Sequence, residues 1–104
     1  MHVSDLASAH VAALDWLGKG RPSQSINLGN GRGFSVGEVV QTTEKVMGRP
    51  VRTQLCPRRA GDPLVLVSDS SKGRELLDWT PKFPELDRQI MHAWTWFRDK
   101  VPEV

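Results

Sequence analysis

Residues 29–38 read Gly29-Asn30-Gly31-Arg32-Gly33-Phe34-Ser35-Val36-Gly37-Glu38, a glycine-rich loop that leads directly into a helix. Ser35 and Glu38 have the spacing of a capping box, in which each side chain binds the backbone N–H of the other residue. Apolar residues then recur at helical spacing as far as Met47, and Gly48 ends the pattern. The stretch therefore predicts a tight loop followed by an amphipathic helix.

Further helices and short strands are predicted on both sides of this loop and helix. Helical spacing of apolar residues predicts a helix from Asp5 to Leu17, with Ser4 and Asp5 as candidate caps. It also predicts a short helix that begins near residues 69–71 and a long one with Pro84 in its first turn. Apolar or alternating residues predict extended segments at 25–28 and 51–55, with 64–67 as a third candidate.

Together these elements predict a small α/β lobe of α+β type, with about four helices and two or three short strands. The 104 residues are expected to form a single domain, 1–104, large enough to bury a core.

Composition excludes several functional classes. The net charge of +2 is small and scattered, so we expect no nucleic-acid surface. Cys56 is the single cysteine and stands outside any metal-ligand spacing, so we expect neither an internal disulfide nor a metal site. No apolar run approaches membrane-spanning length and no signal-peptide pattern is present, so a cytoplasmic location and no membrane partner are expected.

The glycine-rich loop does not predict a cofactor site. Its glycines follow the pattern G-x-G-x-G, and Phe34 occupies the position of the last glycine in the dinucleotide-binding pattern G-x-G-x-x-G. A helix N-terminus such as the one at Ser35 attracts anions, but a glycine turn that joins strand to helix explains the local sequence better. We therefore expect this chain to bind no cofactor.

The segment Pro57-Arg58-Arg59-Ala60-Gly61-Asp62 carries the strongest chemical signal. Guanidinium groups bind phosphate oxygens through several fixed donors and keep their charge. A nearby carboxylate can accept from ribose hydroxyls and orient the arginine, and Gly61 allows a sharp turn. The alternative is an exposed basic turn in which Asp62 is a solvated partner.

In this context several blocks follow one another in a fixed order. They are residues 2–7, 27–36, 57–62, 69–72 and 77–81, followed by Trp94 and Trp96. In this order and spacing the chain resembles, over nearly its whole length, the C-terminal portion of the UDP-glucose 4-epimerases, which are extended short-chain dehydrogenases/reductases of the NAD-dependent epimerase/dehydratase family.

The resemblance implies the substrate-binding lobe of a two-lobed enzyme, without its Rossmann lobe. In that family the N-terminal lobe holds NAD, and a tyrosine of a Tyr-x-x-x-Lys pair removes the proton of the sugar 4-hydroxyl during UDP-glucose/UDP-galactose interconversion in galactose metabolism. This sequence contains no tyrosine. The chain is therefore expected to lack the N-terminal NAD-binding domain and to be inactive as an isomerase on its own, with no catalytic residue.

The resemblance also implies a UDP-binding set. Arg59 matches the arginine that binds the diphosphate, Asp62 the acid that contacts the ribose, and Val36 an apolar residue beside the nucleotide. The alternative for Val36 is a core position on the helix. His2 matches a structural strand end rather than a catalytic residue. Asp78 stands where the family has Gly, at a helix end that favours a left-handed backbone.

Two kinds of partner follow. The first is a UDP-hexose, bound weakly because part of the substrate cage is missing. The second is a protein partner, either the missing Rossmann lobe or a second copy that binds through apolar surface. In that alternative the chain is a non-enzymatic interaction or self-associating module derived from a truncated epimerase. Trp94 lies on the apolar stripe of the last predicted helix and is expected in the core.

Overall fold

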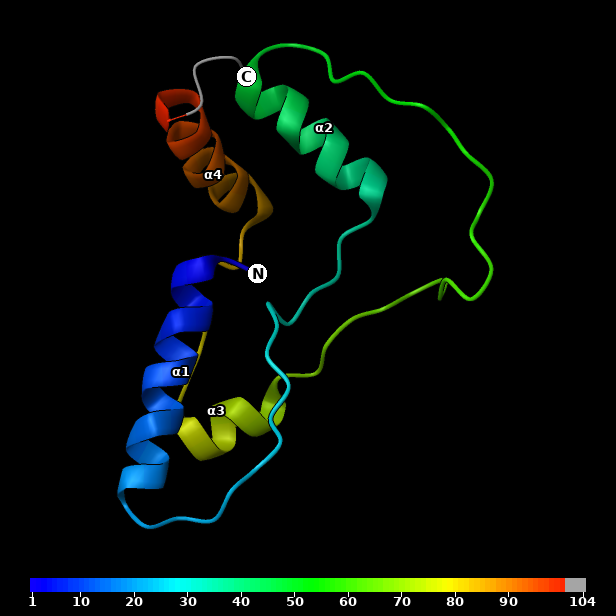
Figure 1. Ribbon diagram of the computed structural model, residues 1–104. Coiled ribbons are helices and arrows are strands. Elements are labelled where there is room, and N and C mark those ends of the chain that lie inside the picture. The colour runs from blue at the N-terminus through cyan, green and yellow to red at the C-terminus, as the bar shows by residue number, and fades with distance from the viewer. Residues whose placement is uncertain (101–104) are drawn as a thin grey trace. The chain divides into compact units, whose positions relative to one another are not determined.

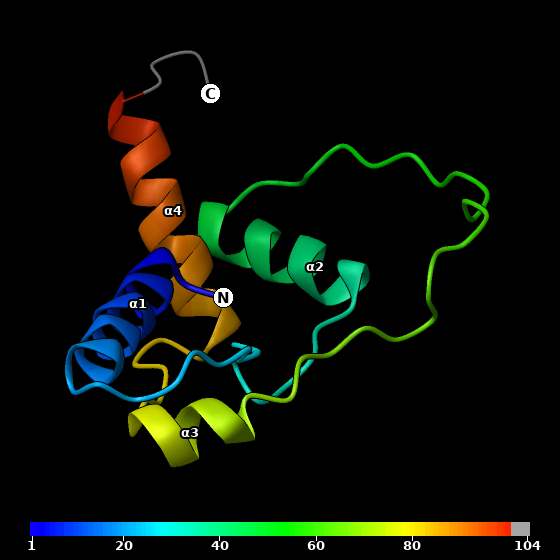
Figure 2. The same ribbon diagram turned by 60° about the horizontal axis from the view of Figure 1, so that its bottom comes forward.

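The computed structural model describes residues 1–100 and contains four helices. In chain order they are α1 (Val3–Gly18), α2 (Val36–Met47), α3 (Ser71–Leu77) and α4 (Leu86–Lys100). The chain forms two compact units, one built from residues 1–33 and 67–85 and the other from residues 34–66 and from residue 86 onward. Helices α1 and α3 belong to the first unit, and α2 and α4 to the second (Figures 1 and 2).

The prediction of four helices is confirmed, but the prediction of strands is wrong. Residues 1–100 contain no β-strand, so the described chain is all-helical rather than α/β. The segments predicted as strands, 25–28, 51–55 and 64–67, are irregular chain. Alternating apolar residues favour an extended backbone, but a strand also needs a neighbouring backbone that pairs with its N–H and C=O groups. Within residues 1–100 these segments pair with no such neighbour.

The first unit is held together at Asp5, a buried carboxylate of α1 that is 1% exposed. Oδ1 of Asp5 accepts from the backbone N–H of Lys82 at 2.8 Å, and Oδ2 accepts from that of Phe83 at 3.0 Å. The backbone carbonyl of Asp5 accepts from the indole Nε1 of Trp79 at 3.1 Å. These bonds tie α1 to the chain that follows α3.

The start of α1 differs from the prediction. His2 is the N-cap, and its Nδ1 accepts from the backbone N–H of Ser4 at 3.0 Å. The predicted caps, Ser4 and Asp5, lie inside the helix, where the Asp5 carboxylate is already bonded elsewhere. His2, predicted as a strand end, is thus a capping residue whose ring also packs on Phe83, with ring centroids 4.6 Å apart.

The glycine-rich loop packs against the segment that precedes α3. A Cβ atom built on Gly33 would lie 2.5 Å from Cγ2 of Val67, and one built on Gly29 would lie 3.0 Å from Cβ of Ser68. A side chain at Gly33 would therefore collide with Val67, which explains the glycine at that position as a packing requirement. Of the two explanations of this loop, the glycine-built turn is the one supported by these contacts.

The end of α3 confirms the prediction for Asp78. This residue has φ 51° and ψ 38°, the left-handed conformation that favours glycine. Asp78 is the one non-glycine residue with positive φ in the described part of the chain. The next residue, Trp79, is buried and lies against Gly73 of α3, where a Cβ atom would come within 3.8 Å of the indole.

The second unit consists of α2 packed on α4, together with the long segment between α2 and residue 66. The predicted capping box is confirmed: Ser35 Oγ accepts from the N–H of Glu38 at 3.1 Å, and Glu38 Oε2 accepts from the N–H of Ser35 at 2.7 Å. Trp94 is half-buried, and the guanidinium of Arg49 lies 5.4 Å from the centre of its ring. Trp94 is therefore a packing residue, although it is not fully enclosed.

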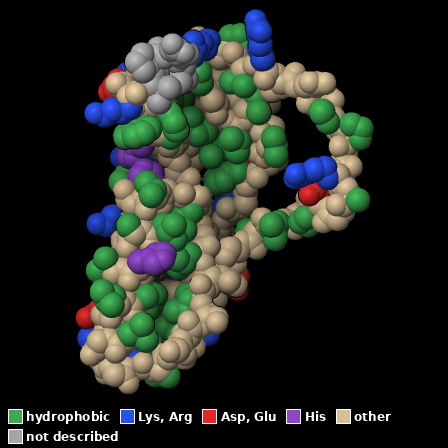
Figure 3. Space-filling view, viewed as in Figure 1, with side chains coloured by type: hydrophobic (Ala, Val, Ile, Leu, Met, Phe, Trp, Pro, Cys, Tyr) green, Lys and Arg blue, Asp and Glu red, His purple; other side chains and the backbone are tan. Residues whose placement is uncertain are grey.

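Many large apolar side chains remain exposed, as Figure 3 shows on one face of the molecule. Ala9 and Trp79 are the buried hydrophobic residues of the described chain. Leu55, Leu64 and Leu66, by contrast, are 101%, 84% and 86% exposed. Contiguous exposed apolar surface marks an interaction site or a liability to aggregate. Exposed apolar side chains are therefore a prominent feature of the described surface.

Candidate functional site

Arg59 and Asp62 are brought together by a turn in the long segment of the second unit. The backbone N–H of Asp62 donates to the carbonyl of Arg59 at 3.3 Å, and Nε of Arg59 donates to Oδ2 of Asp62 at 3.1 Å. The side chain of Arg59 is 86% exposed and that of Asp62 39% exposed. The pair is thus formed by neighbouring residues and presents a guanidinium to solvent.

Val36 is the first residue of α2 and belongs to the same unit as the Arg59–Asp62 pair. Its side chain is 82% exposed, so it is not a core residue of the described structure, and the alternative offered for it is wrong. The segment that carries the pair runs as an extended loop after α2 (Figures 1 and 2). Arg59 and Val36 therefore lie on open surface rather than in a closed pocket.

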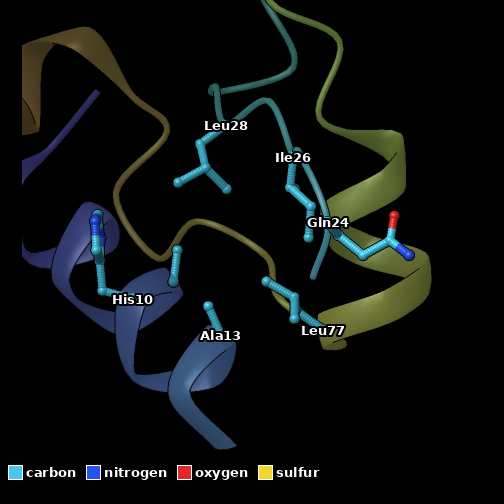
Figure 4. A pocket seen from close by; sticks show the side chains of 7 residues that line it. His10, Ala13, Gln24, Ile26, Leu28 and Leu77 are labelled. Atoms are coloured by element: carbon cyan, nitrogen blue, oxygen red, sulfur yellow. The ribbon is translucent and has the colours of Figure 1, made fainter. Parts of the chain in front are cut away.

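An apolar cavity of about 190 Å³ lies in the first unit. It is lined by Ala9, His10, Ala13, Gln24, Ile26, Leu28 and Leu77. Figure 4 shows Ile26 and Leu28 from the irregular segment and Leu77 from α3 converging on it, while the Gln24 amide points away. His10, on α1, has its Nδ1 2.8 Å from the carbonyl of Leu6. The lining is mostly apolar, with His10 and Gln24 as its polar members.

A second cavity of the first unit, of about 310 Å³, has a polar lining. Asp69, Ser70 and Arg74 contribute to it together with Gly31, Val67 and Ser68. Ser70 is 2% exposed, and its Oγ has no hydrogen-bond partner within the described residues; the same holds for the buried Oδ1 of Asn30. The sequence predicted residues 69–71 only as a helix entrance, so it missed this cavity.

Asp69 performs the predicted role at that helix entrance. Its Oδ1 accepts from the backbone N–H of Ser71 at 3.0 Å. This backbone hydrogen bond, helped by the Ser71 side chain and the positive charge of Arg74, lowers the pKa of the Asp69 carboxyl below its usual value. Asp69 therefore lies directly before the N-cap Ser70, bonds the first N–H of α3 and stays ionised at neutral pH.

A third cavity, of about 510 Å³, lies between α2 and α4. It is lined by Lys45, Val46, Asp87, Met91, Trp94, Thr95 and Arg98. None of these three cavities is lined by Arg59, Asp62 or Val36. Among residues 1–100 no cluster of His, Cys, Asp or Glu could hold a metal ion, and no helix is long and apolar enough to span a membrane.

The chain matches several known UDP-glucose 4-epimerases. The one from Halalkalibacterium halodurans is 46% identical over 99 residues, which are 95% of this chain and 30% of that protein. A crystal structure of UDP-glucose 4-epimerase matches 96% of this chain and 30% of its own, with a TM-score of 0.92 and 42% identity. The structure from Stenotrophomonas maltophila, with bound NAD and formylated UDP-arabinopyranose, covers 100% of this chain, with a TM-score of 0.90 and 38% identity.

In each case the match covers a part of the larger protein. The chain spans about 30% of the length of these relatives. No protein-family model matches it.

Proposed function

Since this chain is homologous to the C-terminal portion of UDP-glucose 4-epimerases, we propose that it is a substrate-binding lobe that holds the UDP part of a nucleotide sugar. The observation that carries the proposal is the exposed Arg59 guanidinium held beside the Asp62 carboxylate at 3.1 Å. An arginine can bind two phosphate oxygens with parallel N–H donors, which suits a diphosphate. In this proposal Asp62 faces the ribose and Val36 contacts the nucleotide.

Exposure of the site leads us to propose weak binding. Water and salt compete for the donors of a guanidinium that is 86% exposed, so a phosphate group bound there gains little free energy. The remaining part of an epimerase-length polypeptide would supply the other walls of the site, because this chain accounts for about 30% of its relatives. We propose that such a polypeptide also covers the exposed leucines of residues 51–66.

The proposal is tested by titrating the chain with UDP and following backbone amide signals by NMR. We expect shifts around residues 57–62 with UDP and much smaller ones with uridine, which lacks the phosphates. Arg59→Ala should abolish the response. Arg58→Ala is the matched control, since it removes an adjacent exposed guanidinium and should leave most of the binding. Unchanged UDP affinity in Arg59→Ala would remove Arg59 from the site.

We also propose that the chain does not epimerise sugars alone. The hydride shuttle of the family depends on a tyrosine, and this sequence has none. The NAD in the Stenotrophomonas structure belongs to a protein about three times as long as the matched region. Incubation of the chain with NAD and UDP-galactose should give no UDP-glucose, and measurable conversion would contradict this part of the proposal.

A second candidate function is favoured by the exposed apolar residues. Because Leu55, Leu64 and Leu66 are largely uncovered, the second candidate is an interaction module whose partner is a second copy or a Rossmann lobe. Sedimentation at several concentrations separates the two candidates. A monomer that responds to UDP supports the first, and a dimer that does not respond supports the second.

A further inference from the structure

The turn between Arg59 and Asp62 is of a kind that requires a glycine. Gly61 has φ +85°, whereas Ala60 has no positive φ, and the N–H of Asp62 donates to the carbonyl of Arg59. Gly61 is the third residue of this turn, and a turn whose second residue has negative φ and whose third has positive φ is of type II. Glycine is favoured at that third position because it has no Cβ atom to cause a steric conflict. The backbone that joins the two charged residues therefore depends on Gly61.

The ion pair uses one particular side of the guanidinium. A guanidinium presents a side edge, which includes Nε, and an end edge formed by its two terminal nitrogens. Asp62 Oδ2 binds Nε of Arg59 at 3.1 Å, so the carboxylate occupies the side edge. The end edge is left to face solvent in a side chain that is 86% exposed.

This geometry resolves an electrostatic difficulty. A carboxylate three residues from a phosphate-binding arginine repels the phosphate by its charge alone. Here the carboxylate lies on the Nε side of Arg59, and the positive guanidinium separates it from any group bound at the end edge. Asp62 can thus restrict the rotamers of Arg59 without standing between Arg59 and its ligand.

We infer that Asp62 is a positioning residue, which together with the Gly61 turn holds Arg59 so that its end edge faces a diphosphate. This inference rests on the proposed UDP-binding function and specifies how Asp62 orients the arginine, through Nε and without the ribose. Ordering one long side chain reduces affinity by about two- to tenfold. Asp62 orders the Arg59 side chain before the ligand binds, so this loss of affinity is avoided. Removal of the Asp62 carboxylate therefore weakens diphosphate binding by the same factor.

Inorganic pyrophosphate is the probe that separates this role from contact with the ribose, because it has no sugar. NMR titration of the full chain should show that Asp62→Ala binds pyrophosphate about two- to tenfold more weakly than the wild type. Electrostatic repulsion alone predicts tighter pyrophosphate binding by Asp62→Ala, since the variant loses a negative charge. Asp62→Asn keeps an oxygen that can accept from Nε, and it should recover part of the affinity.

Glycine variants test the turn with a matched control. Gly61→Ala should weaken pyrophosphate binding by a similar factor, whereas Gly20→Ala should not change it. Gly20 also has a positive φ, +74°, and at neither glycine would a Cβ atom meet another atom within 4 Å. The two substitutions thus introduce comparable backbone strain, at the turn in one case and far along the sequence in the other.

The NMR signal of the Arg59 Nε–H group gives a readout that needs no ligand. We expect it to exchange with water more slowly in the wild type than in Asp62→Ala. The inference is overturned if the Nε–H group exchanges equally fast in the two proteins. It is also overturned if pyrophosphate affinity is unchanged or higher in Asp62→Ala, or if the wild type binds no pyrophosphate. If Arg59→Ala still abolishes UDP binding, the proposed function survives that failure; if the wild type binds neither UDP nor pyrophosphate, both fall.

Discussion

Replacement of Asp5 by asparagine should destabilise the first unit far more than its place on a surface helix suggests. The carboxylate accepts two backbone hydrogen bonds, from Lys82 at 2.8 Å and from Phe83 at 3.0 Å. A hydrogen bond to a charged group contributes about 1.5–3 kcal/mol. Asparagine can accept one of the two bonds, but its NH₂ group then faces the other backbone N–H. We expect the free energy of unfolding to fall by about 2–3 kcal/mol.

Asp5→Ala removes both acceptors and should lower the free energy of unfolding by about 3–5 kcal/mol, because two backbone donors lose their partners. Such a loss is a large fraction of the stability of a small domain. Urea unfolding followed by tryptophan fluorescence reports the change, since the buried Trp79 donates to the carbonyl of Asp5. Hydrogen exchange at the amides of Lys82 and Phe83 reports the same contact locally.

Asp15→Asn is the matched control on the same helix. Asp15 forms an exposed ion pair with Lys19 at 2.8 Å, and such a pair on a helix surface contributes about 0.3–0.5 kcal/mol. The reasoning fails if Asp5→Asn and Asp15→Asn shift the urea midpoint equally. It also fails if the amides of Lys82 and Phe83 exchange at wild-type rates in Asp5→Asn.

Two substitutions and one titration test the ends of the helices. Ser35→Ala should destabilise α2 by about 1 kcal/mol, because Glu38 loses the acceptor of its N–H, and a lower thermal midpoint by circular dichroism would show it. Asp78→Gly should raise the free energy of unfolding by about 0.5–1 kcal/mol by relieving a left-handed aspartate, and a lower thermal midpoint would contradict this. The carboxyl of Asp69 should titrate below 3.8 in a carbon-13 NMR experiment, because the hydrogen bond from Ser71 lowers its pKa. The stability that the ionised Asp69 contributes is present above 3.8 and is lost as the pH falls through the pKa of the folded state.

Local chemistry allowed several features to be predicted from the sequence. The capping box of Ser35 and Glu38 and the sharp turn at Gly61 each involve groups within a few residues of one another. The Arg59–Asp62 pair belongs to the same class, since residues three apart meet across a turn. In these cases the sequence alone determines which atoms can reach each other. The left-handed Asp78 was instead expected from the resemblance, since the family has glycine at that position.

The tertiary structure decided what depends on distant partners. Residues 51–55 have the alternation of a strand, but pairing needs a second backbone, and residues 1–100 provide none. Asp5 was predicted as a helix cap, whereas its carboxylate binds backbone N–H groups more than seventy residues away along the chain. A local pattern specifies the conformation that a segment favours, but which groups satisfy its hydrogen bonds depends on the distant segments that folding brings beside it.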